Sequence, residues 1–308
     1  MNTAVVTGAT GFIGSALTKK LSQKGYLVYA IGRNENRLKK LAEIENVKVV
    51  RADFKEYHEI DKRIDTKVDM FFHCAFEGGF NGSSLKDYAL QLENTKYSCE
   101  AVDCAIRMNC EKFVLASTVN TAEILTFLKQ KDFSPRYTCI YSAAKLTAAI
   151  MGKTLSRNKN MKFCTAMIAM PYGVGNSAET LPNIVIRQLL QHNSPKLIEG
   201  NNLYDLIYIE DVASGLCAIG EKGRDFIDYY VGHRQLETFK TWMIRMRDIL
   251  SPCTALKFGE YPDAPAIDYD LIDLNALFND TGFQCQVDFE ESILKTAEWL
   301  RMQKEGGK

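Results

Sequence analysis

Short runs of β-branched and aromatic residues alternate with amphipathic stretches through the first half of the chain. Six of these runs predict strands: Thr3 to Thr7, Leu27 to Ile31, Val47 to Arg51, Val68 to Cys74, Phe113 to Ser117 and Met161 to Met170. The stretches between them carry apolar residues at helical spacing, for example Ala16, Leu17 and Leu21, and then Leu38, Leu41 and Ile44. Strands and helices in alternation predict an α/β fold, with a doubly wound parallel sheet that has helices on both faces.

The pattern loosens after Pro171. Gly, Asn and Pro are frequent between Tyr172 and Asn202, and the later strand-like runs LIYIE and DYYVG are separated by irregular stretches. We therefore expect a main domain over residues 1–170 and a smaller C-terminal α/β part, mainly over residues 171–308, that binds substrate. Segments within about residues 204–232 are expected to return to the main sheet.

Composition narrows the class of protein. The chain has 308 residues, 46% of them hydrophobic, which is enough to bury a large core. Its 38 basic and 38 acidic residues balance, so no long-range positive field favours nucleic acid or an anionic membrane as a partner. Nine cysteines without metal-type CxxC spacing indicate free thiols and no metal site. The sequence has no recognisable leader and no apolar run of the ~18 residues that span a bilayer, so we expect a cytoplasmic protein.

The segment VVTGATGFIGSAL places three glycines between the first strand and the first helix. Gly8 permits a tight turn, Gly11 lets backbone N–H groups approach a pyrophosphate, and Gly14 lets the helix lie close to the strand. The positive end of the helix dipole then favours the negative charge of the pyrophosphate. A tight strand–helix connection without a ligand is the alternative, but the position in the first βα unit favours dinucleotide binding.

The spacing GxxGxxG resembles the short-chain dehydrogenase/reductase superfamily, which implies a Rossmann-type fold and a nicotinamide dinucleotide. The resemblance places the remaining residues of this turn, Thr10, Phe12 and Ile13, beside the cofactor. It also implies that Asp53 and Phe54, after the third strand, contact the adenine. Asp53 is equally consistent with a helix cap.

The end of the second strand reads AIGRN and bears on the choice of cofactor. Gly32 stands where an acidic residue would bind the ribose 2′-hydroxyl, and Arg33 follows it. A carboxylate that would repel a 2′-phosphate is absent at this position, and a guanidinium that pairs with phosphate is present. The pattern favours NADP(H) over NAD(H), although Arg33 is also consistent with an exposed arginine at a helix start.

Catalytic chemistry is indicated by a YxxxK arrangement. Tyr141 and Lys145 lie four residues apart, so a helix presents both on one face, where the ammonium favours the ionised phenol. A surface pair on an amphipathic helix is the alternative. The apolar run FVLAST, which ends in Ser117 and Thr118, supports the catalytic interpretation. The family resemblance assigns Thr118 to the reacting oxygen, with Ser117 beside it, Tyr141 to proton transfer, and Lys145 to the nicotinamide ribose and the tuning of Tyr141.

Further segments resemble the extended branch, the NAD-dependent epimerase/dehydratase family that acts on nucleotide sugars. They are residues 94–97, PYGVG at 171–175 and YDLIYIEDVASG from Tyr204, and together they extend the similarity over nearly the whole chain. The resemblance implies that Ala75 and Pro171 lie against the cofactor and that Tyr172 lies near the substrate.

Two departures from the family pattern affect the expected reaction. Val119 and Asn120 follow Thr118, where members that eliminate water carry an Asp-Glu pair, so a 4,6-dehydratase is disfavoured. Tyr204 stands where the family commonly has an arginine that contacts the diphosphate. The basic residues that would replace this arginine are Arg187, Lys196 or Arg234. Thr118, Tyr172, Arg187 and Tyr204 are the residues we expect to bind substrate.

Our leading hypothesis is the NADPH-dependent 4-keto reduction of a nucleoside-diphosphate 6-deoxyhexulose. A nucleotide-sugar 4-epimerase with tightly bound NAD is the first alternative. The others are a reductase of a small non-sugar carbonyl and a dinucleotide-binding regulator without turnover. The resemblance also implies a homodimer, formed where the helix that carries Tyr141 and the helix near residues 85–108 pair with their copies in a four-helix bundle.

Overall fold

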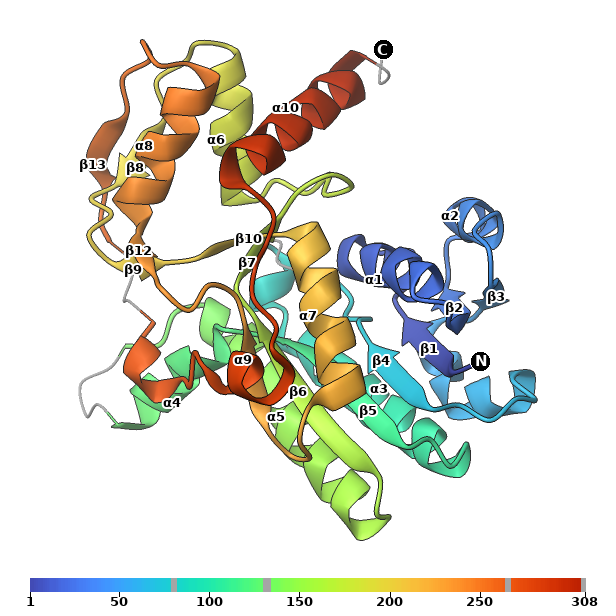
Figure 1. Ribbon diagram of the computed structural model, residues 1–308. Coiled ribbons are helices and arrows are strands. Elements are labelled where there is room, and N and C mark those ends of the chain that lie inside the picture. Colours follow the sequence, from blue (N-terminus) through green and yellow to red (C-terminus); the bar gives the residue numbers. More distant parts are fainter. Residues whose placement is uncertain (79–81, 130–133, 264–266, 306–308) are drawn as a thin grey trace.

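The computed structural model describes residues 1–78, 82–129, 134–263 and 267–305. Its centre is a seven-stranded parallel sheet with the order β11-β6-β5-β4-β1-β2-β3 (Figure 1). The strands are β1 (Thr3–Thr7), β2 (Leu27–Gly32), β3 (Val47–Arg51), β4 (Met70–His73), β5 (Lys112–Thr118), β6 (Lys162–Ile168) and β11 (Asp228–Val231). The predicted doubly wound α/β fold is confirmed.

Helices cover both faces of this sheet because successive side chains of a strand point to opposite sides. In β1, Ala4 and Val6 join one buried apolar cluster, and Val5 joins the other. The first cluster lies under α1 (Phe12–Gln23), α2 (Glu35–Ala42) and α7 (Ile209–Lys222). The second cluster lies under η1 (Phe54–Arg63), α3 (Tyr88–Arg107) and α5 (Thr138–Asn158).

The C-terminal part is built from short strand pairs and helices, which Figure 1 shows gathered mainly at one end of the molecule. The pairs are β7 (Met170–Tyr172) with β10 (Leu206–Tyr208), β9 (Leu203–Tyr204) with β12 (Glu237–Thr238), and β8 (Lys196–Ile198) with β13 (Lys257–Tyr261). Three helices pack around them: α6 (Leu181–Leu190), α8 (Phe239–Leu250) and α10 (Phe289–Glu305). The remaining elements are η2 (Ser84–Lys86), α4 (Thr121–Lys129), η3 (Tyr269–Leu271) and α9 (Ala276–Thr281).

Several element boundaries differ from the sequence prediction. The run from Met161 to Met170 is not one strand, because β6 ends at Ile168 and β7 leaves the main sheet to pair with β10. In LIYIE the strand stops at Tyr208 and α7 begins at the next residue. The run DYYVG supplies β11, which extends the main sheet beside β6. The division of the chain near residue 170 stays a prediction.

The described residues also bear on metal and membrane sites. None of the helices within them combines the length and apolar character that a membrane crossing needs. No group of three or more His, Cys, Asp or Glu among them is placed to hold a metal ion. All nine cysteines are free, and Cys253 is exposed.

Candidate active site

The glycine turn has the geometry that the sequence predicts. Gly8 has a φ of +66°, in the left-handed region, and a Cβ there would lie 2.7 Å from the backbone nitrogen of Ala75. A Cβ on Gly14 would overlap the carbonyl oxygen of Gly8. Both positions therefore require glycine, one for the turn and one for the close approach of α1.

The turn leaves the amino end of α1 available to an anion. No described side chain caps this end, and the first turn contains no acidic residue. The first N–H groups of a helix have no partner within it, and together with the helix dipole they attract phosphate. Gly11 is the N-cap residue, and Phe12 and Ile13 begin the helix.

A cavity of about 370 Å³ connects this turn to the carboxyl ends of β5 and β6. Eleven predicted site residues line it: Gly8, Gly11, Phe12, Ile13, Gly14, Ser117, Thr118, Tyr141, Lys145, Pro171 and Tyr204. The fold thus brings together at one cavity the glycine turn, the end of the FVLAST strand and the YxxxK helix.

The catalytic candidates meet through β5 and α5. Thr118 is the last residue of β5, and its side chain is hydrogen-bonded to that of Tyr141. The Thr118 hydroxyl also accepts a hydrogen bond from the N–H of Asn120, at 3.2 Å. One helical turn beyond Tyr141, Lys145 Nζ donates to the carbonyl oxygen of Ala116, at 2.9 Å. Thr118, Tyr141 and Lys145 are all buried.

Burial controls the protonation of this pair. It raises the pKa of the Tyr141 phenol, and the hydrogen bond from Thr118 only partly opposes that effect. It lowers the pKa of the Lys145 ammonium to about 7, although the Cys74 thiol acts in the opposite direction. Burial is the largest influence on the pKa of the phenol, and the effect of the ammonium on it stays a prediction. Phe76 contacts both side chains: Lys145 Nζ lies 3.8 Å from the centre of its ring, and the Tyr141 ring stands edge-on to it at 5.5 Å.

The chemistry of the cavity fits a dinucleotide. The Ser117 hydroxyl is buried and lines the cavity, yet it has no hydrogen-bond partner among the described residues. Such a group costs free energy unless a ligand or water pairs with it. This hydroxyl, the glycine turn and the uncapped end of α1 together provide donors along a path from the turn to Tyr141 and Lys145.

Other predicted cofactor residues lie at the outer edge of the turn rather than in the cavity lining. Arg33 Nη1 forms an ion pair with Glu77 Oε1 at 2.8 Å, and its guanidinium lies 5.4 Å from the centre of the Phe54 ring. Ala75 is buried against Gly8. Thr10 packs on the end of β2.

Asp53 shows the geometry of a helix cap. Its N–H donates to Glu56 Oε2 at 2.7 Å, in a capping box at the start of η1. This arrangement supports the capping interpretation that the sequence left open, and the contact with adenine stays a prediction.

The residues expected to bind substrate are dispersed. Tyr172 is buried and its hydroxyl is 2.5 Å from Ser292 Oγ, outside both cavities described here. Arg187, on α6, forms an ion pair with Glu179. Tyr204 lines the first cavity and also belongs to a second one.

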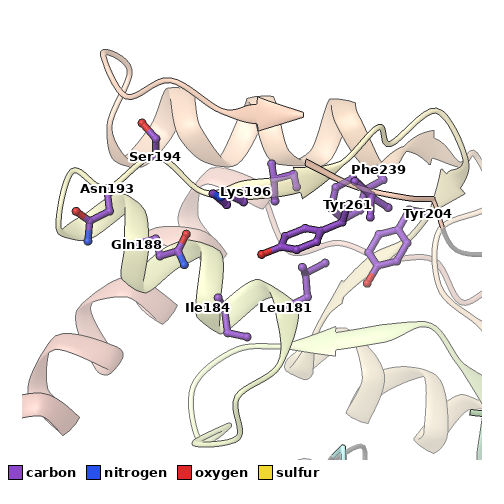
Figure 2. A pocket seen from close by; sticks show the side chains of 11 residues that line it. Leu181, Ile184, Gln188, Asn193, Ser194, Lys196, Tyr204, Phe239 and Tyr261 are labelled. Carbon is purple, nitrogen blue, oxygen red and sulfur yellow. The ribbon is translucent and has the colours of Figure 1, made fainter. Parts of the chain in front are cut away.

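This second cavity, of about 590 Å³, lies between α6 and β8 (Figure 2). Figure 2 shows the Tyr204 and Tyr261 rings on one side of it and Lys196, Gln188 and Asn193 on the other. Lys196 is the only cation among its described lining residues. Because Tyr204 lines both cavities, they are neighbours.

Sequence reasoning missed several lining residues: Phe76, Asn120, Asp205 and Tyr269. Phe76 directly follows Ala75 in HCAF, and the expectation for Ala75 alone overlooked that the next side chain lines the cavity. Asp205 was hidden because its role depends on distant partners. Its carboxylate accepts hydrogen bonds from the Tyr230 hydroxyl at 2.6 Å and the His233 N–H at 2.7 Å, and it lies 2.6 Å from His233 Nδ1.

Comparison with known proteins gives a consistent result. The profile of the NAD dependent epimerase/dehydratase family matches residues 4–232. The CDP-abequose synthase of Salmonella typhimurium is 25% identical over 80% of this chain and 81% of its own. A probable dTDP-glucose 4,6-dehydratase of Sinorhizobium fredii is 26% identical over 96% of this chain and 91% of its own.

Solved structures share the fold. The UDP-glucose 4-epimerase of Thermotoga maritima, solved with UDP-glucose, superposes with a TM-score of 0.78 at 19% identity. The similarity covers 99% of this chain and 100% of that one. The smaller C-terminal part is therefore included in the common architecture.

Proposed function

Because the chain belongs to the NAD-dependent epimerase/dehydratase family, we propose that it is an enzyme that reduces the 4-keto carbon of a nucleoside-diphosphate 6-deoxyhexulose with NADPH. One observation carries the proposal: Thr118, Tyr141 and Lys145 converge on the cavity that the glycine turn also lines. The Salmonella CDP-abequose synthase, whose name denotes a nucleotide-linked sugar, supports this class of substrate.

The protonation of Tyr141 supports reduction. When bound, the nicotinamide cofactor supplies the hydride. A carbonyl that accepts hydride must also gain a proton on oxygen, and Tyr141 enters the reaction protonated because burial raises its pKa. Thr118 orients the carbonyl oxygen through its hydroxyl. Lys145 is held at the carbonyl of Ala116 and lines the same cavity, and in this proposal it contacts the nicotinamide ribose and tunes Tyr141.

The carboxylates near the cavity argue against elimination of water. Removal of a proton and loss of hydroxide need an acid and a base of their own. Asp205 is the only carboxylate among the described lining residues, and Tyr230 and His233 already occupy its oxygens. Glu123, five residues after Thr118 along the chain, is buried in an ion pair with Arg136. This arrangement supports a reaction other than the one named for its Sinorhizobium relative.

The second cavity offers a place for the nucleotide. Its aromatic and amide side chains suit a base, and Tyr204 stands between it and the first cavity. A nucleoside diphosphate that spans Tyr204 would place its sugar beside Tyr141. Arg187 pairs with Glu179 and Lys196 pairs with Glu260, but only Lys196 lines this cavity, so Lys196 is the better placed of the two to contact phosphate.

The main alternative is a 4-epimerase. It uses the same three side chains, but Tyr141 must first act as a base, and NAD must remain bound through both half-reactions. Reduction of a non-sugar carbonyl is the second alternative, which the tyrosine at position 204 in place of an arginine keeps open. A dinucleotide-binding regulator has no need of a buried Thr, Tyr and Lys set.

The experiment is turnover by the purified protein with a panel of nucleoside-diphosphate 4-keto-6-deoxy sugars. We expect stoichiometric loss of the absorbance of NADPH at 340 nm, with NADH less effective, and a product that has gained two hydrogens by mass spectrometry. Tightly bound NAD in the purified protein, with interconversion of nucleotide hexoses and no net loss of NADPH, would indicate the epimerase. Binding of NADPH without turnover of any carbonyl would support the regulator.

A further inference from the structure

An ion pair joins the segments that follow β2 and β4, beside the glycine turn. Arg33 follows β2, and Glu77 lies four residues after β4. These two strands flank β1 in the sheet, so the 2.8 Å bond between Arg33 Nη1 and Glu77 Oε1 spans the end of β1. The adenosine half of a dinucleotide binds at this end in a Rossmann fold.

The position of Glu77 is built into the fold. Asn94 of α3 is buried, and its side-chain oxygen accepts from the N–H of Glu77 at 2.8 Å while its amide donates to the Glu77 carbonyl at 3.0 Å. The backbone of Glu77 is therefore held on both sides, and its carboxylate is directed to Arg33 rather than left on a free loop.

A second arginine lies at the same edge, and no carboxylate in the described part of the chain pairs with it. Arg37, in the first turn of α2, donates from Nη1 to the carbonyl oxygen of Thr10 at 2.9 Å, so its guanidinium lies over the glycine turn. Within the described residues it forms no ion pair, whereas Arg33 pairs with Glu77 and Arg51 pairs with Glu35. The remaining N–H groups of Arg37 are donors in a fixed geometry that suits phosphate.

We propose that Arg37 and Glu77 set the cofactor selectivity: Arg37 binds the 2′-phosphate of NADPH, and Glu77 competes with that phosphate for Arg33. The inference rests on the cofactor of the proposed function and adds two residues to it. The side chains of Arg33 and Glu77 are 51% and 37% exposed, and an ion pair so accessible to water is weak. A phosphate dianion is therefore able to displace the carboxylate and to bridge both arginines.

The test is direct binding of NADPH and NADH to the purified full chain, measured by calorimetry without substrate. We expect Arg37→Ala to weaken the binding of NADPH by roughly tenfold or more and that of NADH by less than about twofold, because only NADPH carries the 2′-phosphate. Glu77→Gln should tighten the binding of NADPH by a few fold and leave the binding of NADH unchanged. This gain should disappear when Arg33 is also alanine, since Glu77 acts through Arg33.

The matched control is Glu59→Gln. Glu59 is 41% exposed and pairs with Lys62, so it resembles Glu77 but lies in η1. We expect no change in the ratio of the two dissociation constants. Thermal unfolding of each variant will show that it is folded.

Two results would overturn the inference. Equal weakening of NADPH and NADH by Arg37→Ala would mean that Arg37 only supports the turn. Weaker NADH binding in Glu77→Gln would mean that the carboxylate holds the ribose hydroxyls, in the place of the acid that is missing at Gly32. Neither result depends on turnover. The proposal on selectivity can therefore be refuted while keto-sugar reduction stands, and keto-sugar reduction can be refuted while the proposal on selectivity stands.

Discussion

Tyr141 and Lys145 face one cavity from successive turns of α5. The sequence predicts their spacing. It does not predict their protonation, because this depends on how far the fold removes each group from water. The ring of Phe76 lies against the Lys145 amine, with Nζ 3.8 Å from the ring centre. At the scale of single residues, burial raises the pKa of Tyr141, which favours the protonated phenol that the proposed reduction requires.

Replacement of the phenol tests this role. We expect Tyr141→Phe to lower kcat by roughly a hundredfold or more, because only proton transfer is removed. NADPH affinity should stay nearly unchanged in a calorimetric titration. Tyr137→Phe is the matched control, since Tyr137 is at the start of the same helix and 64% exposed. Undiminished turnover in the Tyr141 variant would refute the catalytic assignment.

Burial of Lys145 predicts a dependence of stability on pH. The unfolded chain keeps this lysine protonated up to its ordinary pKa of 10.5, whereas the folded protein releases the proton above about pH 7. Between these values the unfolded state binds more protons, so the contribution of Lys145 to stability is lowest below pH 7 and rises with pH. Relative to Lys145→Met, the wild-type free energy of unfolding should rise by up to about 1.4 kcal/mol per pH unit in this window.

Urea unfolding at several pH values from 6 to about 9 measures this difference. Lys159→Met, which removes an exposed lysine at the end of the same helix, is the control and should show no such rise. A wild-type minus Lys145→Met difference that stays flat over the window would contradict the buried, readily deprotonated amine.

The elements that build the site are a turn and the helix after it. Gly8 and Gly14 were predicted from their spacing alone. At each position another segment of backbone lies so close that the residue must lack a Cβ. The end of β6 was not predicted. The apolar run continues through Met170, and only the pairing of β7 with β10 makes the chain leave the sheet at Ala169.

Insertion of one methyl group tests the turn. We expect Gly14→Ala to abolish detectable NADPH binding and to lower the free energy of unfolding by about 1–3 kcal/mol, because the new Cβ meets the Gly8 carbonyl and must displace α1. Calorimetry and urea unfolding measure the two effects. Gly82→Ala is the control, since no described atom lies within 4 Å of a Cβ there. Normal binding by the Gly14 variant would show that α1 has room to shift.

At the scale of the whole molecule, helices α3 and α5 expose several apolar side chains. Tyr88 and Leu92 of α3 are 69% and 64% exposed, and Met151 of α5 is 48% exposed. Cys99, on the same face of α3 as Leu92, lies 3.9 Å from Met151 through the two sulfur atoms. These side chains, here called the apolar strip, lie on α3 and α5, the two helices for which the family resemblance implies a four-helix bundle.

The homodimer stays a prediction that this strip makes testable. We expect light scattering to give a mass of about twice the chain mass of 34.8 kDa. The double substitution of Leu92→Arg with Met151→Arg should convert the protein to a monomer. Leu128→Arg is the control, because Leu128 is 72% exposed on α4, away from the strip. A wild-type monomer, or a dimer that survives the double substitution, would contradict the predicted interface.

The local features of this protein followed from its sequence. Strand and helix alternation specified the doubly wound sheet. The spacings of Gly8 and Gly14 specified the turn, and those of Tyr141 and Lys145 specified a shared helix face, because these demands act between near neighbours in the chain. Interactions between distant residues did not follow. Arg33 and Glu77 are 44 positions apart, and Tyr204 joins two cavities made by separate elements. Tertiary structure alone decided which charges are neutralised and which hydroxyls are buried, because both depend on contacts between residues that are far apart in the sequence.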